Sequence, residues 1–194
     1  ACGTKRVIMS TQQKTNFRSR SLIFVDIETT GLDFTKHEII EIAYLVVSAK
    51  TFEVVSEHSF KIKPLHIELA DPKALEINGY SDKEWGGAQS LRSVLIEFNN
   101  TASEGMLTGW NISFDWAFLE KAFMDLGVTP KFDYHRIDVM SIAFAMLYSK
   151  KEIEHLNLRK MAPIFGINLP ETHGAMGDIE ATYKLFTRLM KNEN

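Results

Sequence analysis

The chain has 194 residues, 45% of them apolar, and a formal charge of −3 at pH 7. This size and composition predict one compact domain with its own core and exclude a pair of ordinary domains. No apolar run approaches the ~18 residues that a membrane span needs, so we expect a soluble protein without a membrane partner.

Residues 1–20 predict a basic leader ahead of a domain over residues 21–194. The leader holds five of the 22 basic residues and none of the 25 acidic ones, so the rest of the chain is acidic. We expect a flexible solvated tail; the alternative is a nucleic-acid-contacting arm or the remnant of a targeting peptide. The only cysteine, Cys2, excludes an internal disulfide framework and a multi-thiolate zinc site. A single cysteine favours a reducing compartment, so we expect an intracellular protein, in the cytoplasm rather than in the nucleus or an organelle, both of which stay open.

Three strands are predicted after the leader. A short apolar run ends on a carboxylate at Asp26, a second run is rich in Ile and Val, and a third shows partial alternation before Pro64. Because the turns between them are short, these strands should be antiparallel neighbours. We expect them over residues 21–26, 38–47 and 52–62.

The rest of the chain alternates helices and strands. Asp71 before Pro72 predicts the start of a short helix, which Asn78-Gly79 would end after Ile77. Meander strands followed by strand-helix units indicate an α/β protein, a three-layer α/β/α sandwich with a mixed sheet. We expect helices over 88–99, over a segment that carries Phe118 to Leu126 and ends at Gly127, from the end of the last strand to Ser149, over 156–166 with a break near Pro163, and from about Gly177 onward; strands are expected over 105–109 and 133–138.

The strongest local signal is a pair of carboxylates, Asp26 and Glu28, at the end of the first strand. Side chains two positions apart in a strand point to the same side, so both could contact one cation. No Lys or Arg occurs between Leu22 and Thr35, and adjacent like charges are costly without a positive partner. A metal ion is the economical partner; the alternative is an exposed strand end with two solvated acids.

Three further residues extend this pattern. Asp115 follows a predicted central strand at its junction with a helix, where ligands bind in α/β sheets, and Asp178 lies near the start of the last helix. Each could instead be a helix cap or a dipole-stabilising acid. His173 lies in a glycine-containing segment five residues before Asp178, from where it could reach a metal-bound water. The other five histidines have no comparable acidic company and are assigned no role.

These segments resemble the three exonuclease motifs of the DEDDh family, which includes ribonuclease T, oligoribonuclease and the proofreading epsilon subunit of DNA polymerase III. The first motif matches Asp26 to Leu32, and the second matches Asn111 to Asp115 with Phe118 following. The third is the His-x-Ala-x-x-Asp pattern from His173 to Asp178.

The resemblance covers residues 22–190, and the family's Ile-Ile-Glu-Ile stretch recurs at residues 39–42. In the sister subclass a catalytic tyrosine stands four residues before the last Asp, a position that is Gly174 here. The histidine subclass is therefore indicated, with a ribonuclease H-like fold and a mixed five-stranded sheet.

The resemblance implies a 3′-to-5′ exonuclease that releases nucleoside monophosphates from single-stranded DNA or RNA ends. Asp26, Glu28 and Asp178 would bind one divalent cation, with Asp26 bridging to a second that Asp115 helps to hold through water. An oxygen donor set without cysteine independently suits two Mg²⁺ or Mn²⁺ ions better than zinc. His173 would take the proton of the attacking water.

Further residues are candidates for the pocket that receives the 3′ end. By resemblance, Gly31 allows close approach and Leu32 wedges between the last two bases. The aromatic residues of the second motif could stack on bases, and the alternative of core packing is stronger for Phe118 than for Phe114. Asn78 stands where proofreading relatives often carry histidine, so its role is open. The candidate substrate-binding residues are Thr29, Gly31, Leu32, Asn78, Trp110, Asn111, Phe114 and Phe118.

The main alternative is a non-catalytic nucleic-acid-binding or scaffold module on the same fold, and a purely structural cation-binding protein is a weaker one. Such a module would be expected to have lost at least one metal-binding carboxylate, whereas all four are present. The sequence leaves the choice between DNA and RNA, the pathway and the oligomeric state open.

Overall fold

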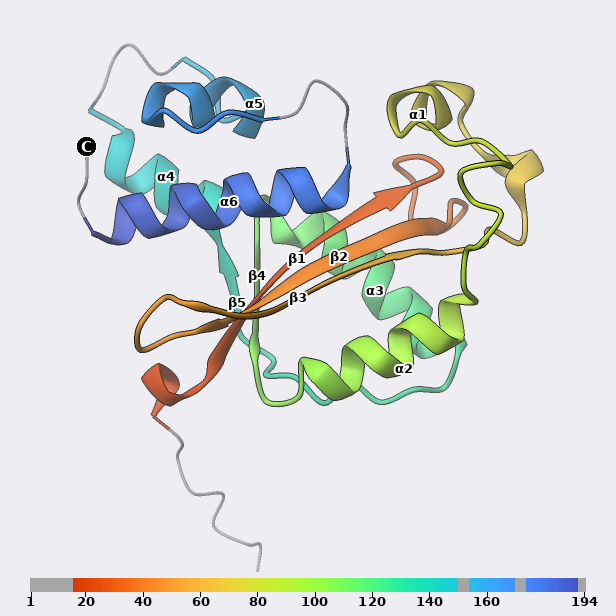
Figure 1. Cartoon of the computed structure of the whole chain (residues 1–194), viewed down its shortest axis with the longest axis horizontal. Coiled ribbons are helices and arrows are strands. Elements are labelled where there is room, and N and C mark those ends of the chain that lie inside the picture. Colours follow the sequence, from red (N-terminus) through yellow and green to blue (C-terminus); the bar gives the residue numbers. More distant parts are fainter. Residues whose placement is uncertain (1–15, 150–153, 170–173, 192–194) are drawn as a thin grey trace, which may run out of the picture.

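A mixed five-stranded sheet organises the protein, with the strand order β3-β2-β1-β4-β5 (Figure 1). The structure is a computed structural model that describes residues 16–149, 154–169 and 174–191. β1 is antiparallel to β2, which is antiparallel to β3, whereas β4 is parallel to both β1 and β5. The predicted five-stranded mixed sheet is confirmed. The strands are β1 (Ser21–Thr29), β2 (Ile39–Ser48), β3 (Val54–Lys61), β4 (Met106–Gly109) and β5 (Arg136–Asp138).

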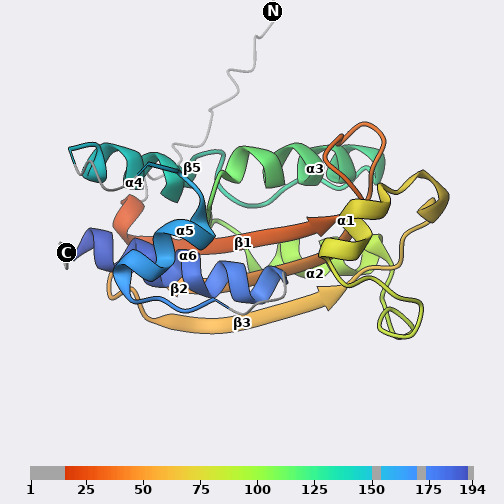
Figure 2. The ribbon, with the colours of Figure 1, turned by 90° about the horizontal axis from the view of Figure 1, so that it is seen from above.

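Helices lie on both sides of this sheet, which confirms the α/β sandwich (Figures 1 and 2). The last helix, α6, packs on β1 and β2, and α4 packs between α6 and β4. On the other side of the sheet, α3 packs on β1, β4 and β5, and α2 packs against β2. The helices are α1 (Pro72–Ile77), α2 (Leu91–Thr101), α3 (Ile112–Asp125), α4 (Val139–Leu147), α5 (Leu158–Met161) and α6 (Ala175–Met190), with short 3₁₀ turns η1 (Phe17–Ser19), η2 (Ile67–Leu69) and η3 (Ala162–Phe165).

The alternation of β1 decides which face carries the acidic residues. The Phe24 ring contacts the Phe186 ring of α6, with centroids 5.3 Å apart. The Tyr44 ring, paired in register with Val25, contacts the Phe98 ring of α2 at 4.9 Å on the opposite face. Because side chains alternate along a strand, Asp26 and Glu28 share the face of Phe24 and lie towards α6.

The helix boundaries follow the capping signals closely. Helix α1 begins at Pro72 with the Asp71 side chain accepting a hydrogen bond from Lys73 N, and Gly79 follows its end with φ +63°. The predicted helix over 156–166 is divided into α5 and η3 at Pro163, as expected. Helix α6 begins at Ala175, two residues before the predicted start, so Asp178 lies in its first turn.

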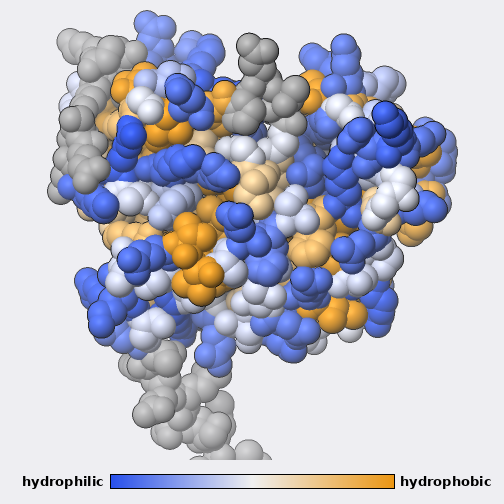
Figure 3. All heavy atoms as spheres, in the orientation of Figure 1, coloured by the Kyte–Doolittle hydropathy of each residue, from blue (hydrophilic) through white to orange (hydrophobic). Residues whose placement is uncertain are grey.

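The end of the predicted leader belongs to the folded body. Residues 16–20 contain η1, whose start is capped by the Asn16 side chain, and the Arg20 guanidinium pairs with the Asp133 carboxylate. The predicted leader over residues 1–20 thus ends in a capped turn and an ion pair, and its first 15 residues, with Cys2, lie outside the described residues. Within the described residues, no helix is long and apolar enough to cross a membrane. The face seen in Figure 1 is mainly hydrophilic, with small separate apolar patches (Figure 3).

Candidate active site

The site is built on the carboxyl-terminal half of β1. Asp26 and Glu28 point towards α6 and are both half-buried. In the register with β2, Asp26 lies opposite Ala43 and Glu28 lies opposite Glu41. Asp26 thus lies opposite a small residue, whereas two acids face each other two pairs further along.

Asp115 is brought to β1 by the first turn of α3. Its side chain is only 3% exposed, and its Oδ1 accepts a hydrogen bond from Ile27 N at 3.1 Å, between the two β1 acids. The turn into α3 is set by Asn111, which has φ +53° and whose backbone N donates to Asp138 Oδ1 at 2.9 Å. The junction of strand and helix that the sequence predicted therefore delivers Asp115 to the site.

Asp178 reaches the same place from the first turn of α6. Its Oδ1 accepts a hydrogen bond from the Arg159 guanidinium at 2.9 Å, and both side chains are partly buried. Arg159 belongs to α5, which the sequence did not connect with the site. A basic residue on a separate short helix carries no sequence signal for that contact.

The electrostatics show that the four carboxylates lie within interaction range. Burial, followed by the charges of Asp115, Glu28 and Asp178, raises the pKa of Asp26 well above its usual value. Burial and then Asp178 raise the pKa of Glu28 to about 7, partly opposed by Arg159. Burial raises the pKa of Asp115 to about 8, opposed by its backbone hydrogen bonds. The site therefore concentrates negative charge that little in the protein compensates.

The donor chemistry fits a hard divalent cation, because the side chains supply oxygen atoms alone and their mutual repulsion favours a bound positive ion. The side chains are nevertheless not arranged as a finished coordination sphere. Within the described part of the chain, no group of three or more Asp, Glu, His or Cys residues could hold an ion as it stands. One oxygen of Asp115 accepts from Ile27 N and one of Asp178 accepts from Arg159.

Glu41 is a member of the site that the sequence reasoning did not single out. Its charge raises the pKa of both Asp26 and Glu28, and its carboxylate accepts a hydrogen bond from the backbone N of Ala175, the first residue of α6. Glu41 thus fastens the start of α6 to β2. Its signal was an acid inside an otherwise apolar strand.

Candidates for the 3′-end pocket lie at the end of β1, in the loop after it and at the end of α1. Leu32 is 82% exposed, as a side chain that contacts a substrate would be, whereas Thr29 is buried. The Asn78 amide donates to Thr29 O at 2.9 Å, so Asn78 braces this loop. At Gly31, with φ +157°, a Cβ would lie 2.6 Å from the His37 ring. The close approach that Gly31 permits is therefore to His37, a residue that had been assigned no role.

The aromatic residues of the second motif divide between core and surface. Phe118 is 3% exposed and contacts the rings of Phe114 and Phe34, at 5.1 and 6.4 Å between centroids. Its burial makes it a support for those rings. Trp110 and Phe114 are half-buried and Asn111 is exposed, so they remain candidates for substrate contact. His173 lies outside the described residues.

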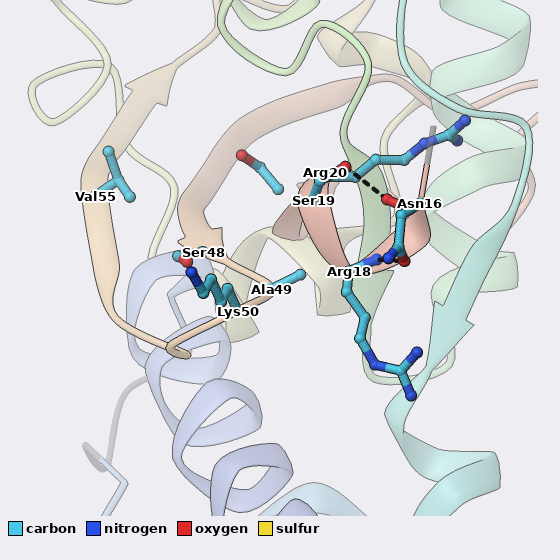
Figure 4. A pocket seen from close by; sticks show the side chains of 9 residues that line it. Asn16, Arg18, Ser19, Arg20, Ser48, Ala49, Lys50 and Val55 are labelled. Carbon is cyan, nitrogen blue, oxygen red and sulfur yellow. Dashed lines mark hydrogen bonds between the residues drawn. The ribbon is translucent and has the colours of Figure 1, made fainter. Parts of the chain in front are cut away.

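A separate pocket lies at the opposite end of β1 (Figure 4). It is lined by Asn16, Arg18, Ser19, Arg20, Ser21, Ser48, Ala49, Lys50 and Val55. Glu28 lies seven residue steps along β1 from Ser21, which corresponds to roughly 23 Å. This pocket contains no acidic residue and is distinct from the carboxylate site.

Comparison with known proteins gives consistent matches. The family described as "Exonuclease" (RNase T) matches residues 23–186. DNA polymerase III PolC-type from Halalkalibacterium halodurans is 30% identical over 170 residues, which cover 88% of this chain and 11% of that protein. The PolC-type polymerase of Thermotoga maritima is 28% identical over 190 residues, covering 95% and 13%. The chain thus spans about a tenth of the length of these relatives.

Solved structures of E. coli exonuclease I share the fold. The zinc-bound complex with single-stranded DNA has a TM-score of 0.78 at 19% identity, covering 91% of this chain and 41% of that chain. The complex with a dT13 oligonucleotide has a TM-score of 0.77 at 21% identity, covering 89% and 41%. With the family match over most of the sequence and three motifs in order, the chain belongs to the exonuclease family of ribonuclease T.

Proposed function

We propose that the chain hydrolyses single-stranded DNA or RNA from the 3′ end with two divalent cations, Mg²⁺ or Mn²⁺, and releases nucleoside monophosphates. The observation that carries the proposal is the mutual charge interaction of Asp26, Glu28, Asp115 and Asp178, supplied by β1, α3 and α6. Such an accumulation of buried like charge is unfavourable in a structural role and is typical of a site that binds cations.

We assign the acids the roles that the family resemblance implies. Asp26 interacts with each of the other three and is the natural shared ligand, while Glu28 and Asp178 would hold the first ion with it. Asp115, fixed by Ile27 N, would act on the second ion through water. When bound, the cations would lower the pKa of the attacking water and stabilise the leaving 3′ oxygen. His173 would accept the proton of that water.

The substrate is proposed to reach the acids along the loop after β1. Leu32 projects into solvent beside the site and would contact the terminal bases, with Thr29, Gly31 and Asn78 shaping the loop behind it. Half-buried Trp110 and Phe114, with Asn111, would line the other side, where an aromatic face can stack on any base. A preference for single strands is supported by exonuclease I, which was solved with single-stranded oligonucleotides.

The experiment is digestion of 5′-labelled DNA and RNA oligonucleotides of matched sequence, as single strands and as blunt duplexes, with Mg²⁺, Mn²⁺ or EDTA. We expect ladders that shorten from the 3′ end and release mononucleotides from single strands, with no products in EDTA. The matched control is Asp82→Asn, which changes an exposed acid and should leave the ladders unchanged. If folded protein releases no mononucleotides with either metal, the chain is a non-catalytic binding module instead.

A further inference from the structure

Arg159 brings a positive charge to the acidic site. Its Nη2 donates to Asp178 Oδ1 at 2.9 Å, and the exposed fractions of the two side chains are 24% and 16%. It also lies close enough to Glu28 to oppose the rise in the pKa of that carboxyl. The guanidinium therefore interacts with two of the acids that are proposed to hold the first cation.

The short helix α5 holds Arg159 in this position. The Asn157 side chain caps its start by accepting from Lys160 N, and Leu158 and Met161 on either side of Arg159 are buried. These apolar residues pack in the same cluster as Leu185 and Leu189 of α6. Because α5 is anchored to the helix that carries Asp178, the pair joins two elements that already contact each other.

A charge-assisted hydrogen bond to Arg159 and a bond to a metal ion make conflicting demands on Asp178. The oxygen that accepts from the guanidinium is directed at Nη2, and a divalent cation beside Asp178 would be repelled by the guanidinium charge. In this arrangement no three acids of the described residues form a cation site. Asp178 Oδ1 is therefore the atom for which the guanidinium and a cation would compete.

We propose that Arg159 and the first divalent cation compete for Asp178. In the metal-free enzyme Arg159 neutralises Asp178, and when the cation binds, Asp178 exchanges the guanidinium for the metal. This inference rests on the proposed metal-dependent function of the site. Arg159 is then a positioning residue that sets the metal concentration at which the enzyme becomes active.

A supporting role for Arg159 predicts a change in metal affinity of the opposite sign. If Arg159 instead held Asp178 in the orientation that the cation needs, removal of the guanidinium would weaken metal binding. Competition predicts tighter binding, because the rival donor and its repulsive charge disappear together. The sign of the change in metal affinity therefore separates the two roles.

The experiment measures Mn²⁺ binding by titration calorimetry in the absence of nucleic acid, with the thermal midpoint of unfolding followed against Mn²⁺ concentration. Arg159→Met removes the charge and keeps a long, helix-compatible side chain. We expect its apparent Kd for Mn²⁺ to fall at least about fivefold, in line with the loss of one charge-assisted hydrogen bond. Arg159→Lys keeps the charge but loses the guanidinium geometry, so its Kd should lie between those of the unchanged protein and Arg159→Met.

Lys160→Met is the matched control, because Lys160 is exposed on the same turn of α5 and its removal should leave the Kd unchanged. Arg159→Gln provides a second neutral variant with the same expected result should the Met variant fail to fold by circular dichroism. Unchanged or weaker Mn²⁺ binding in a folded neutral variant would overturn the competition and leave the nuclease intact. Absence of Mn²⁺ binding to the unchanged protein would overturn both the competition and the metal-dependent function.

Discussion

The two ends of β1 differ in how charge is balanced. At its start, the Arg20 guanidinium pairs with the Asp133 carboxylate, which also accepts a hydrogen bond from His135 N at 2.8 Å. Towards its end, Asp26 and Glu28 meet two further acids, and Arg159 compensates only part of their charge. An ion pair within the protein needs no further partner, whereas concentrated negative charge raises carboxyl pKa values and calls for a cation from outside. The difference separates the end that supports the fold from the end that supports chemistry.

Asp26→Asn should have the largest effect, and that effect should fall on the acidic end of β1. Because Asp26 interacts with all three other acids, its loss should lower kcat for mononucleotide release by at least about a hundredfold, as removal of one group that stabilises the transition state does. The same change removes an acid that burial and its neighbours destabilise, so the metal-free protein should become more stable at pH 8 by about 1–2 kcal/mol. Both effects are measurable, by oligonucleotide digestion and by urea denaturation in EDTA. A variant that keeps more than half of its activity would remove Asp26 from the catalytic set.

The metal-free protein should lose stability as the pH rises. Folding raises the pKa of Glu28 to about 7 and that of Asp115 to about 8, so the folded state binds more protons than the unfolded state between about pH 4 and 8. The stabilisation is present below the unfolded pKa values and is lost as the pH passes through the folded ones. We expect the free energy of unfolding in EDTA to fall by roughly 2–4 kcal/mol between pH 5 and pH 8.5.

Metal should reverse this trend, because a cation favours the ionised carboxylates. Adding Mn²⁺ should therefore raise the thermal midpoint more at pH 8.5 than at pH 5, and Asp26→Asn should flatten the pH dependence measured in EDTA. Stability in EDTA that rises steadily from pH 5 to pH 8.5 would contradict the assignment of buried, mutually repelling acids.

The acidic end of β1 could be predicted from the sequence. Asp26 and Glu28 stand out because strand periodicity places them on one face and no basic residue lies nearby in the chain. The caps of α1 were equally legible, since Asp71, Pro72 and Gly79 each act on their own turn of backbone.

The contacts that complete the site could not be predicted from the sequence, because they join distant parts of the chain. The hydrogen bond from Ala175 N to Glu41 depends on how α6 docks on β2, and Arg159 reaches Asp178 only because α5 folds back onto α6. The Arg20–Asp133 pair likewise joins the leader to a loop before β5, so composition alone made residues 16–20 look like a free tail. Local periodicity reports a residue's own element and says little about its tertiary partner.

Asp133→Asn should lower stability at the start of β1 without affecting activity. It leaves Arg20 without its carboxylate partner in a partly buried position, so the free energy of unfolding should fall by about 1–3 kcal/mol. The acidic site lies at the far end of the strand, and kcat per folded molecule should therefore stay unchanged. Urea denaturation and oligonucleotide digestion on the same preparation measure the two quantities. A loss of kcat comparable to that of Asp26→Asn would mean that the two ends are coupled.

Leu32→Ala should give the smallest effect and one confined to substrate. The side chain is 82% exposed, so its truncation should change the free energy of unfolding by less than about 0.5 kcal/mol. If it packs against the terminal bases, losing that apolar contact should lower kcat/KM on single strands about threefold to tenfold. Leu65→Ala is the matched control, because Leu65 is a comparably exposed leucine, 78%, outside the loop after β1, and its loss should leave both quantities unchanged. Equal kcat/KM for both variants would mean that the exposed residue next to the acids does not touch the strand being cut, and the 3′ end would then have to enter from the side of Trp110 and Phe114.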